Sequence, residues 1–165
     1  MKILFCFTCL ALLFSKSSVA QVSKVIPQEA NDFYNKSMPL LRTQVKNIVL
    51  HTAKAIENRK INADSLTQTL KANKTLKQIS NNDIAGIIVL IMVQASKDAD
   101  ADLKNMVLAI SHSNEQKENY QDDANERQNL QLQMIMDRKS DMAEEVSYVM
   151  KKISGTQQNI INNLK

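Results

Sequence analysis

The chain has 165 residues, of which 44% are hydrophobic and 23% are charged, and it contains only 2 Gly, 2 Pro and no Trp. The hydrophobic fraction argues against a disordered tail, and the scarcity of turn-forming residues argues against sandwiches, barrels and alternating strand–helix folds. We therefore expect an all-α fold, either an elongated helical bundle or a long antiparallel helical hairpin, with a coiled-coil-like C-terminal helix.

The first twenty residues have the layout of a secretory signal peptide. Lys2 precedes an apolar run over residues 3–14, and Ser18-Val19-Ala20 places small residues at the −3 and −1 positions of a cleavage site. The apolar run is shorter than the roughly 20 residues that span a bilayer, although a retained anchor helix is the alternative interpretation. We predict cleavage near Ala20 and export to the periplasm or the extracellular space, with residues 21–165 forming a single helical domain.

Removal of this leader changes the chemistry of the chain. Cys6 and Cys9 are its only cysteines, so the mature protein offers neither a disulfide nor a thiolate to a metal. Loss of Lys2 and Lys16 leaves 19 of the 21 basic residues against 17 acidic ones, a net charge of +2. So small a charge gives little support to nucleic-acid binding, and we predict none.

The charges are unevenly distributed along the chain. Residues 40–80 carry eight basic and two acidic side chains, whereas residues 81–145 carry thirteen acidic and six basic ones. The basic stretch could bind anionic lipid or another polyanion, which makes peripheral membrane contact one hypothesis. We favour the alternative that the two halves pack side by side and attract each other.

Start signals and apolar spacing predict the first helices. Pro27 opens a short helix with acidic residues in its first turn, and Pro39 interrupts it. Ser37 is the expected N-cap of a second helix over residues 39–60, whose apolar residues recur every three or four positions. A shorter third helix is expected over residues 64–79.

The sequence then predicts a central helix. Ser80-Asn81-Asn82-Asp83 supplies short polar side chains that can cap it. Residues 84–93 are almost unbroken apolar sequence, which is typical of a helix buried in protein or in a membrane. Ten helical residues extend about 15 Å, about half of a hydrocarbon core, so we predict a core helix in which Gly86 marks the close approach of another helix.

Apolar spacing continues to Ile110, and residues 111–129 then lose nearly all apolar character. This stretch is either a turn followed by an exposed helix or the solvated continuation of one long rod. If a turn is present, residues 112–114 are its predicted position.

A heptad pattern predicts that the last helix belongs to a bundle. With Leu132 at position a, Ile135 falls at position d, and Gly155 marks a helix end, although the pattern continues to Leu164. Position a holds Leu132, Lys139, Val146, Ile153 and Ile160, position d holds Ile135, Met142, Val149 and Thr156, and position e holds Met136, Ala143 and Met150. The predicted interaction residues are Leu132, Ile135, Met142, Val146, Val149 and Ile153.

No motif in the sequence predicts catalysis or metal binding. Asp98, Asp100 and Asp102 resemble the opening of a calcium loop, but the Gly and Glu that such a loop requires are replaced by Leu103 and Ala109. The two histidines, His51 and His112, have no partner at zinc-ligand spacing, and we find no activated nucleophile and no Gly-rich phosphate loop. We therefore predict no catalytic, cofactor-binding or metal-binding residue, no cofactor and no small-molecule substrate.

The mature chain is rich in methionine, with seven residues: Met38, Met92, Met106, Met134, Met136, Met142 and Met150. Methionines of this kind either line an adaptable binding groove or fill gaps in a core, and we favour the core.

Together these patterns predict an exported, non-enzymatic helical protein that acts as a structural or protein-interaction module, through self-association or a protein partner. One alternative is a membrane-active protein that inserts residues 84–93 into a bilayer. Another is a helical subunit of a bacterial secretion or surface apparatus.

Overall fold

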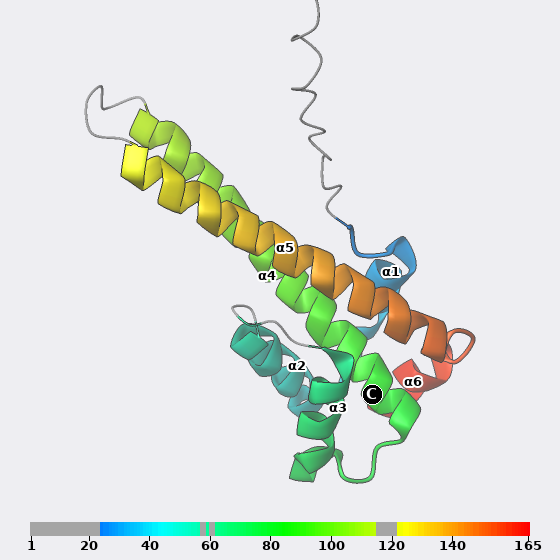
Figure 1. The fold of residues 1–165 in the computed structure, drawn as a ribbon. Coiled ribbons are helices and arrows are strands. Elements are labelled where there is room, and N and C mark those ends of the chain that lie inside the picture. The colour runs from blue at the N-terminus through cyan, green and yellow to red at the C-terminus, as the bar shows by residue number, and fades with distance from the viewer. Residues whose placement is uncertain (1–23, 57–58, 60–61, 115–121) are drawn as a thin grey trace, which may run out of the picture.

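The computed structural model (Figure 1) describes residues 24–56, 59, 62–114 and 122–165. The described residues form helices and no strand, so the predicted all-α fold is confirmed. In chain order the elements are α1 (Gln28–Ser37), α2 (Thr43–Ile56), α3 (Ala63–Ala72), the 3₁₀ helix η1 (Lys74–Leu76), α4 (Asn81–Asn114), α5 (Asp122–Ile153) and α6 (Gln157–Leu164). The predicted leader, residues 1–20, lies outside the described residues.

The chain is built around a long antiparallel hairpin of α4 and α5, as the fold prediction anticipated (Figure 1). The short helices surround the part of the hairpin where α4 begins and α5 ends, and α4 contacts each of α1, α2, α3, α5 and α6. We call this part the head. The rest of the hairpin extends beyond the short helices (Figure 1). We use the name arm for residues 100–114 of α4 and 122–139 of α5.

The first turn of α4 is held by a reciprocal cap. The backbone N–H of Asp83 donates to the Ser80 hydroxyl at 3.1 Å, and that hydroxyl donates to the Asp83 carboxylate at 2.7 Å. The buried Asp83 carboxylate also accepts two hydrogen bonds from the Asn163 amide, at 3.2 and 3.3 Å. The predicted start of α4 is therefore confirmed, and the same carboxylate ties that start to α6.

Residues 84–93 lie in the centre of the head. All of them are buried except Ala85, which is half-buried. Burial of each large apolar side chain contributes about 1.5–3 kcal/mol to stability, so this run is a major source of the core's stabilisation. The predicted core helix is confirmed, and none of the described helices combines the length and apolar character needed to cross a membrane.

Gly86 lies where α1, α4 and α6 meet. A Cβ atom at this position would lie 2.5 Å from Cγ2 of Ile160 and 3.5 Å from Cζ of Phe33. The absence of a side chain thus lets α6 approach the backbone of α4. The close approach predicted at this glycine is confirmed.

The connection between α1 and α2 corrects two predictions. Ser37 is the last residue of α1, where its buried hydroxyl donates to the Phe33 carbonyl at 2.6 Å, so it does not cap α2. α2 begins at Thr43 rather than Pro39, because the preceding residues form a turn that buries Leu41. The Arg42 N–H donates to the Leu164 carbonyl at 3.0 Å, so a contact with α6, distant in sequence, holds this turn.

α3 is shorter than predicted. It begins after Asn62, whose side chain accepts a hydrogen bond from the Ser65 N–H at 2.8 Å, and it ends at Ala72 instead of residue 79. Asn73 then adopts an extended conformation, and its side chain accepts from the Thr75 N–H at 2.9 Å at the start of η1. An asparagine that bonds to the backbone in this way competes with helix continuation, which explains the early end.

The hairpin resolves the alternatives left open for residues 111–129. A single continuous rod is excluded because α4 and α5 are antiparallel. The turn predicted at residues 112–114 is wrong, since α4 continues through Asn114 in a stretch that contains no Gly or Pro to end it. At the other end, Gly155 has a φ of +78° and lies two residues after the last residue of α5, so the predicted helix end is confirmed. α6 then buries Ile160 and Leu164.

Candidate functional site

The heptad residues predicted for interaction lie largely inside the chain. Leu132 is half-buried, and the other five, Ile135, Met142, Val146, Val149 and Ile153, are buried. In this fold their side chains pack against the chain's own helices, as the seam of a bundle helix does. Their contact with a partner stays a prediction, and among these six Ile135 also lines the groove described below.

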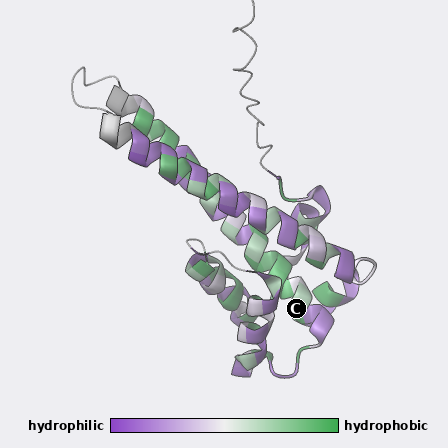
Figure 2. Ribbon diagram, in the orientation of Figure 1, coloured by the Kyte–Doolittle hydropathy of each residue, from purple (hydrophilic) through white to green (hydrophobic). Residues whose placement is uncertain are grey.

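The exposed apolar surface is concentrated on the arm. Of the nine large apolar residues that are exposed in the described part of the chain, five belong to the arm: Val107, Leu108, Leu130, Met134 and Met136. Leu130 and Met134 are 59% and 60% exposed, whereas Ile135 is the one buried residue among the arm side chains that the structure describes. Figure 2 shows hydrophobic residues continuing along the arm beyond the short helices. Two paired helices bury only their facing sides, so apolar residues beside the seam remain in solvent.

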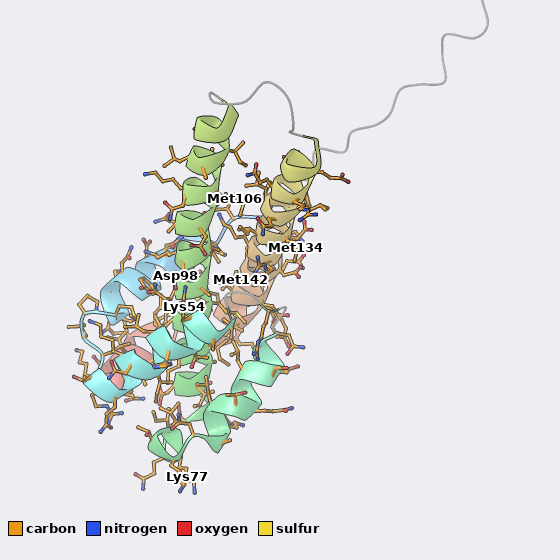
Figure 3. All side chains as sticks on the ribbon, turned by 90° about the vertical axis from the view of Figure 1, so that its left-hand side faces the viewer. Lys54, Lys77, Asp98, Met106, Met134 and Met142 are labelled. Atoms are coloured by element: carbon orange, nitrogen blue, oxygen red, sulfur yellow. The ribbon has the colours of Figure 1, made fainter. Side chains whose placement is uncertain are left out.

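One side of the arm is hollowed into a groove between α4 and α5. The groove has a volume of about 680 Å³, and its lining residues are Asp102, Met106, Ala109, Gln128, Gln131, Met134, Ile135 and Arg138. Figure 3 shows Met106 and Met134 on the two helices of the arm and Met142 nearer the head. Met38, Met92, Met142 and Met150 are buried, so the core interpretation holds for these four, while Met106 and Met134 line the groove.

The middle of the arm carries no formal charge from acidic or basic side chains. Residues 105–111 of α4 and 128–136 of α5 contain no Asp, Glu, Lys or Arg, and their polar residues are Asn, Gln and Ser. The two charged residues of the groove, Asp102 and Arg138, lie toward the head, where the Lys139 ammonium also pairs with the Asp100 carboxylate. The groove therefore combines flexible methionines with amide side chains, a lining suited to contacts with another polypeptide.

A polar cluster joins α1 to α4 on the head. The Tyr34 hydroxyl donates to Oε1 of Gln94, whose amide nitrogen donates to Oδ1 of Asp98 at 2.8 Å. The Lys97 ammonium lies 4.5 Å from the centroid of the Tyr34 ring. Burial, together with the nearby Asp98 carboxylate, raises the pKa of Tyr34 above its ordinary value of 10.0. Tyr34 therefore acts as a hydrogen-bond donor that fastens α1 to α4.

The three aspartates of the calcium-like string have separate surroundings. Asp98 accepts from Gln94, Asp100 pairs with Lys139, and Asp102 lines the groove. Within the described ranges, no three His, Cys, Asp or Glu side chains gather in a way that could hold a metal ion. His51 is exposed on α2, and the side chain of His112 lies outside what the structure describes.

The basic residues of the stretch 40–80 are exposed on the head. Those described are Arg42, Lys46, Lys54, Arg59, Lys71, Lys74 and Lys77. The ion pairs Lys139–Asp100 and Lys24–Glu144 lie outside this stretch, and Lys54 within it interacts with another group. Attraction between the basic and acidic halves of the chain stays a prediction.

Comparison of this chain with protein-family models, with curated proteins and with solved structures gives no match. The fold and its exposed surface define a helical protein whose two-helix arm carries a groove rich in methionine and amide side chains. The methionine pattern allows a groove at Met106 and Met134 but favours a core role, and no sequence pattern singles out Gln128 and Gln131. The uncharged runs over residues 105–111 and 128–136 are the signal that could have located it.

Proposed function

We propose that this protein is an exported, non-enzymatic module that binds protein through its arm. The observation that carries the proposal is the exposed groove on an arm that extends beyond the head. Contiguous apolar surface on a folded protein commonly marks a site of interaction. The leader pattern that ends at Ala20 supports export.

The chemistry of the arm favours a protein partner over a lipid surface. Helices that bind at membrane interfaces combine an apolar face with Lys and Arg that attract anionic lipid, and residues 105–111 and 128–136 have neither Lys nor Arg. The amides of Gln128 and Gln131 can both donate and accept hydrogen bonds, which suits another polypeptide. A membrane-active role for residues 84–93 would require the head to open, because these residues form its core.

Photo-cross-linking in the organism of origin tests this proposal. A photoreactive amino acid replaces Met134 in the groove of the full chain, and the matched control replaces Leu50, an exposed apolar residue on α2 of the head. We expect irradiation to produce a discrete, heavier protein adduct from the Met134 position and much less from Leu50. Absence of an adduct at Met134, or equal labelling at both positions, would contradict binding through the arm.

Membership of a secretion or surface apparatus is a narrower form of the same proposal. If it is correct, we expect the adduct at Met134 to contain a component of such an apparatus and the gene to lie beside genes for that apparatus. An adduct with an unrelated protein would still support binding through the arm, but it would contradict membership of such an apparatus.

A further inference from the structure

The groove of the arm has the chemistry of a surface that binds its own copy. We propose that two copies of this chain pair groove to groove, with their arms parallel, so that two α4–α5 hairpins form a four-helix bundle. This inference rests on the proposed function, because it takes the arm to be the binding surface and names a second copy as the partner.

The arm has the packing of half a bundle. In the head, α4 contacts α1, α2, α3 and α6 in addition to α5, and its apolar residues are buried. Along the arm, which extends beyond the short helices in Figure 1, Met134 and Leu130 remain exposed beside the seam. Four-helix bundles bury such residues by packing a second pair of helices against the first. A second hairpin supplies that pair.

The polar residues around the groove are complementary to themselves. A two-fold interface places the same patch of both copies in contact, so a patch with one sign of charge repels its own copy. In residues 105–111 and 128–136 the polar side chains are amides and hydroxyls, which carry both a donor and an acceptor. Such groups can pair with the same groups of a second copy. A partner chosen by charge would require a charged patch here.

The charges at the head end of the groove set the orientation. Asp102 lies on α4 and Arg138 on α5, so the two helices contribute opposite charges to the same groove. A two-fold axis along the arms places α4 of one copy against α5 of the other. Asp102 of one copy then lies beside Arg138 of the other, and the four charges alternate in sign around the bundle. This complementarity persists if Asp102 and Arg138 also interact within each copy.

The mass of the protein in solution tests the inference. The full chain is expressed with its own leader, and light scattering after size exclusion is compared with the chain mass from mass spectrometry. We expect the wild-type protein to have twice the chain mass at high concentration. Met134→Asp should raise the dissociation constant at least about tenfold, because it places a charge in the centre of the interface. Leu130→Asp, about one helical turn before Met134 on α5, is the second variant that tests this surface.

Leu108→Asp is the matched control. Leu108 is 48% exposed and also lies on the arm, but it does not line the groove and points to the other side of α4 from Met106. Its dissociation constant should stay within about threefold of wild type, as for a surface substitution outside the interface. All three substituted residues are exposed, so circular dichroism and thermal unfolding should match the wild-type protein.

A charge swap tests the parallel orientation. Asp102→Arg and Arg138→Asp should each weaken pairing, and the double variant, which restores the alternating charges, should recover it. A wild-type chain that stays monomeric at every concentration overturns the inference, while an adduct between Met134 and another protein would still uphold the proposed function. Equal weakening by Leu108→Asp and Met134→Asp, or a double swap no better than the single ones, also overturns groove-to-groove parallel pairing.

Discussion

Replacing Gly86 with Ala sets two opposing effects against each other. In an exposed helix this change adds about 1 kcal/mol to the free energy of unfolding, because Gly loses more conformational freedom on folding. At Gly86 the new Cβ would lie 2.5 Å from Cγ2 of Ile160, and that side chain is buried and β-branched, so it has little room to move. Overpacking of this kind costs about 1–3 kcal/mol. We therefore expect Gly86→Ala to lower the free energy of unfolding by about 1 kcal/mol.

Urea unfolding followed by far-ultraviolet circular dichroism measures this effect, and an Ile160→Ala background isolates its cause. Ile160→Ala alone should cost about 2–5 kcal/mol, since it leaves a cavity in the core. In that background the clash is gone, so Gly86→Ala should now stabilise the protein by about 1 kcal/mol. A change of the same sign and size in both backgrounds would refute the assignment of Gly86 to helix contact.

Three other positions in the head offer independent tests. Asp83→Ala removes the buried carboxylate that accepts from the Ser80 hydroxyl and the Asn163 amide, so the free energy of unfolding in urea should fall by about 1–3 kcal/mol. Ile91→Asp buries an unpaired carboxylate at the centre of the core and should abolish cooperative thermal unfolding. The pKa of Tyr34 is raised in the folded state, so the neutral side chain stabilises the fold fully below pH 10.0, and this stabilisation is lost as the pH rises through the higher pKa. Absorbance of tyrosinate should show a component that titrates late, and Tyr34→Phe should remove it.

Exposed positions supply the controls for these tests. Asp137→Ala and Leu50→Asp alter exposed side chains and should change the free energy of unfolding by less than about 0.5 kcal/mol. An Asp83→Ala protein as stable as Asp137→Ala, or an Ile91→Asp protein that unfolds like Leu50→Asp, would be incompatible with the core described above. A late tyrosinate component that survives in Tyr34→Phe would assign the raised pKa to another tyrosine.

The central helix could be predicted because its signals are local. A polar cap at Ser80, an unbroken apolar run over residues 84–93 and a lone Gly86 each act within a few residues, and each has the predicted outcome in the fold. Gly155 is a further local signal, since a left-handed backbone after a helix favours glycine.

The predicted helix boundaries were wrong where contacts between distant residues determine them. The late start of α2 depends on the hydrogen bond from the Arg42 N–H to the Leu164 carbonyl, which joins residues far apart in sequence. The prediction of a turn after Ser111 was wrong for a different reason. Residues 112–114 are polar, but polarity alone does not end a helix that has no Gly or Pro.

The exposed groove could not be predicted from apolar spacing. In the heptad with Leu132 at position a, Leu130 and Met134 fall outside positions a, d and e, which hold the buried residues of α5. The pattern therefore places them off the seam, and whether another helix covers them depends on how many helices pack there. The heptad pattern located the seam between α4 and α5 but said nothing of its flanks. Lys139, an apparent defect at position a, pairs with Asp100 where the seam enters the arm.

The place of α6 determines when the head can finish folding during synthesis. Ile160, Ile161 and Leu164 are buried, and the ribosome makes them after every other residue of the head. A nascent chain therefore carries an unclosed core until α6 has emerged. That delay leaves the segments ahead of α6 without their last packing partner for longer than in a fold whose core closes early.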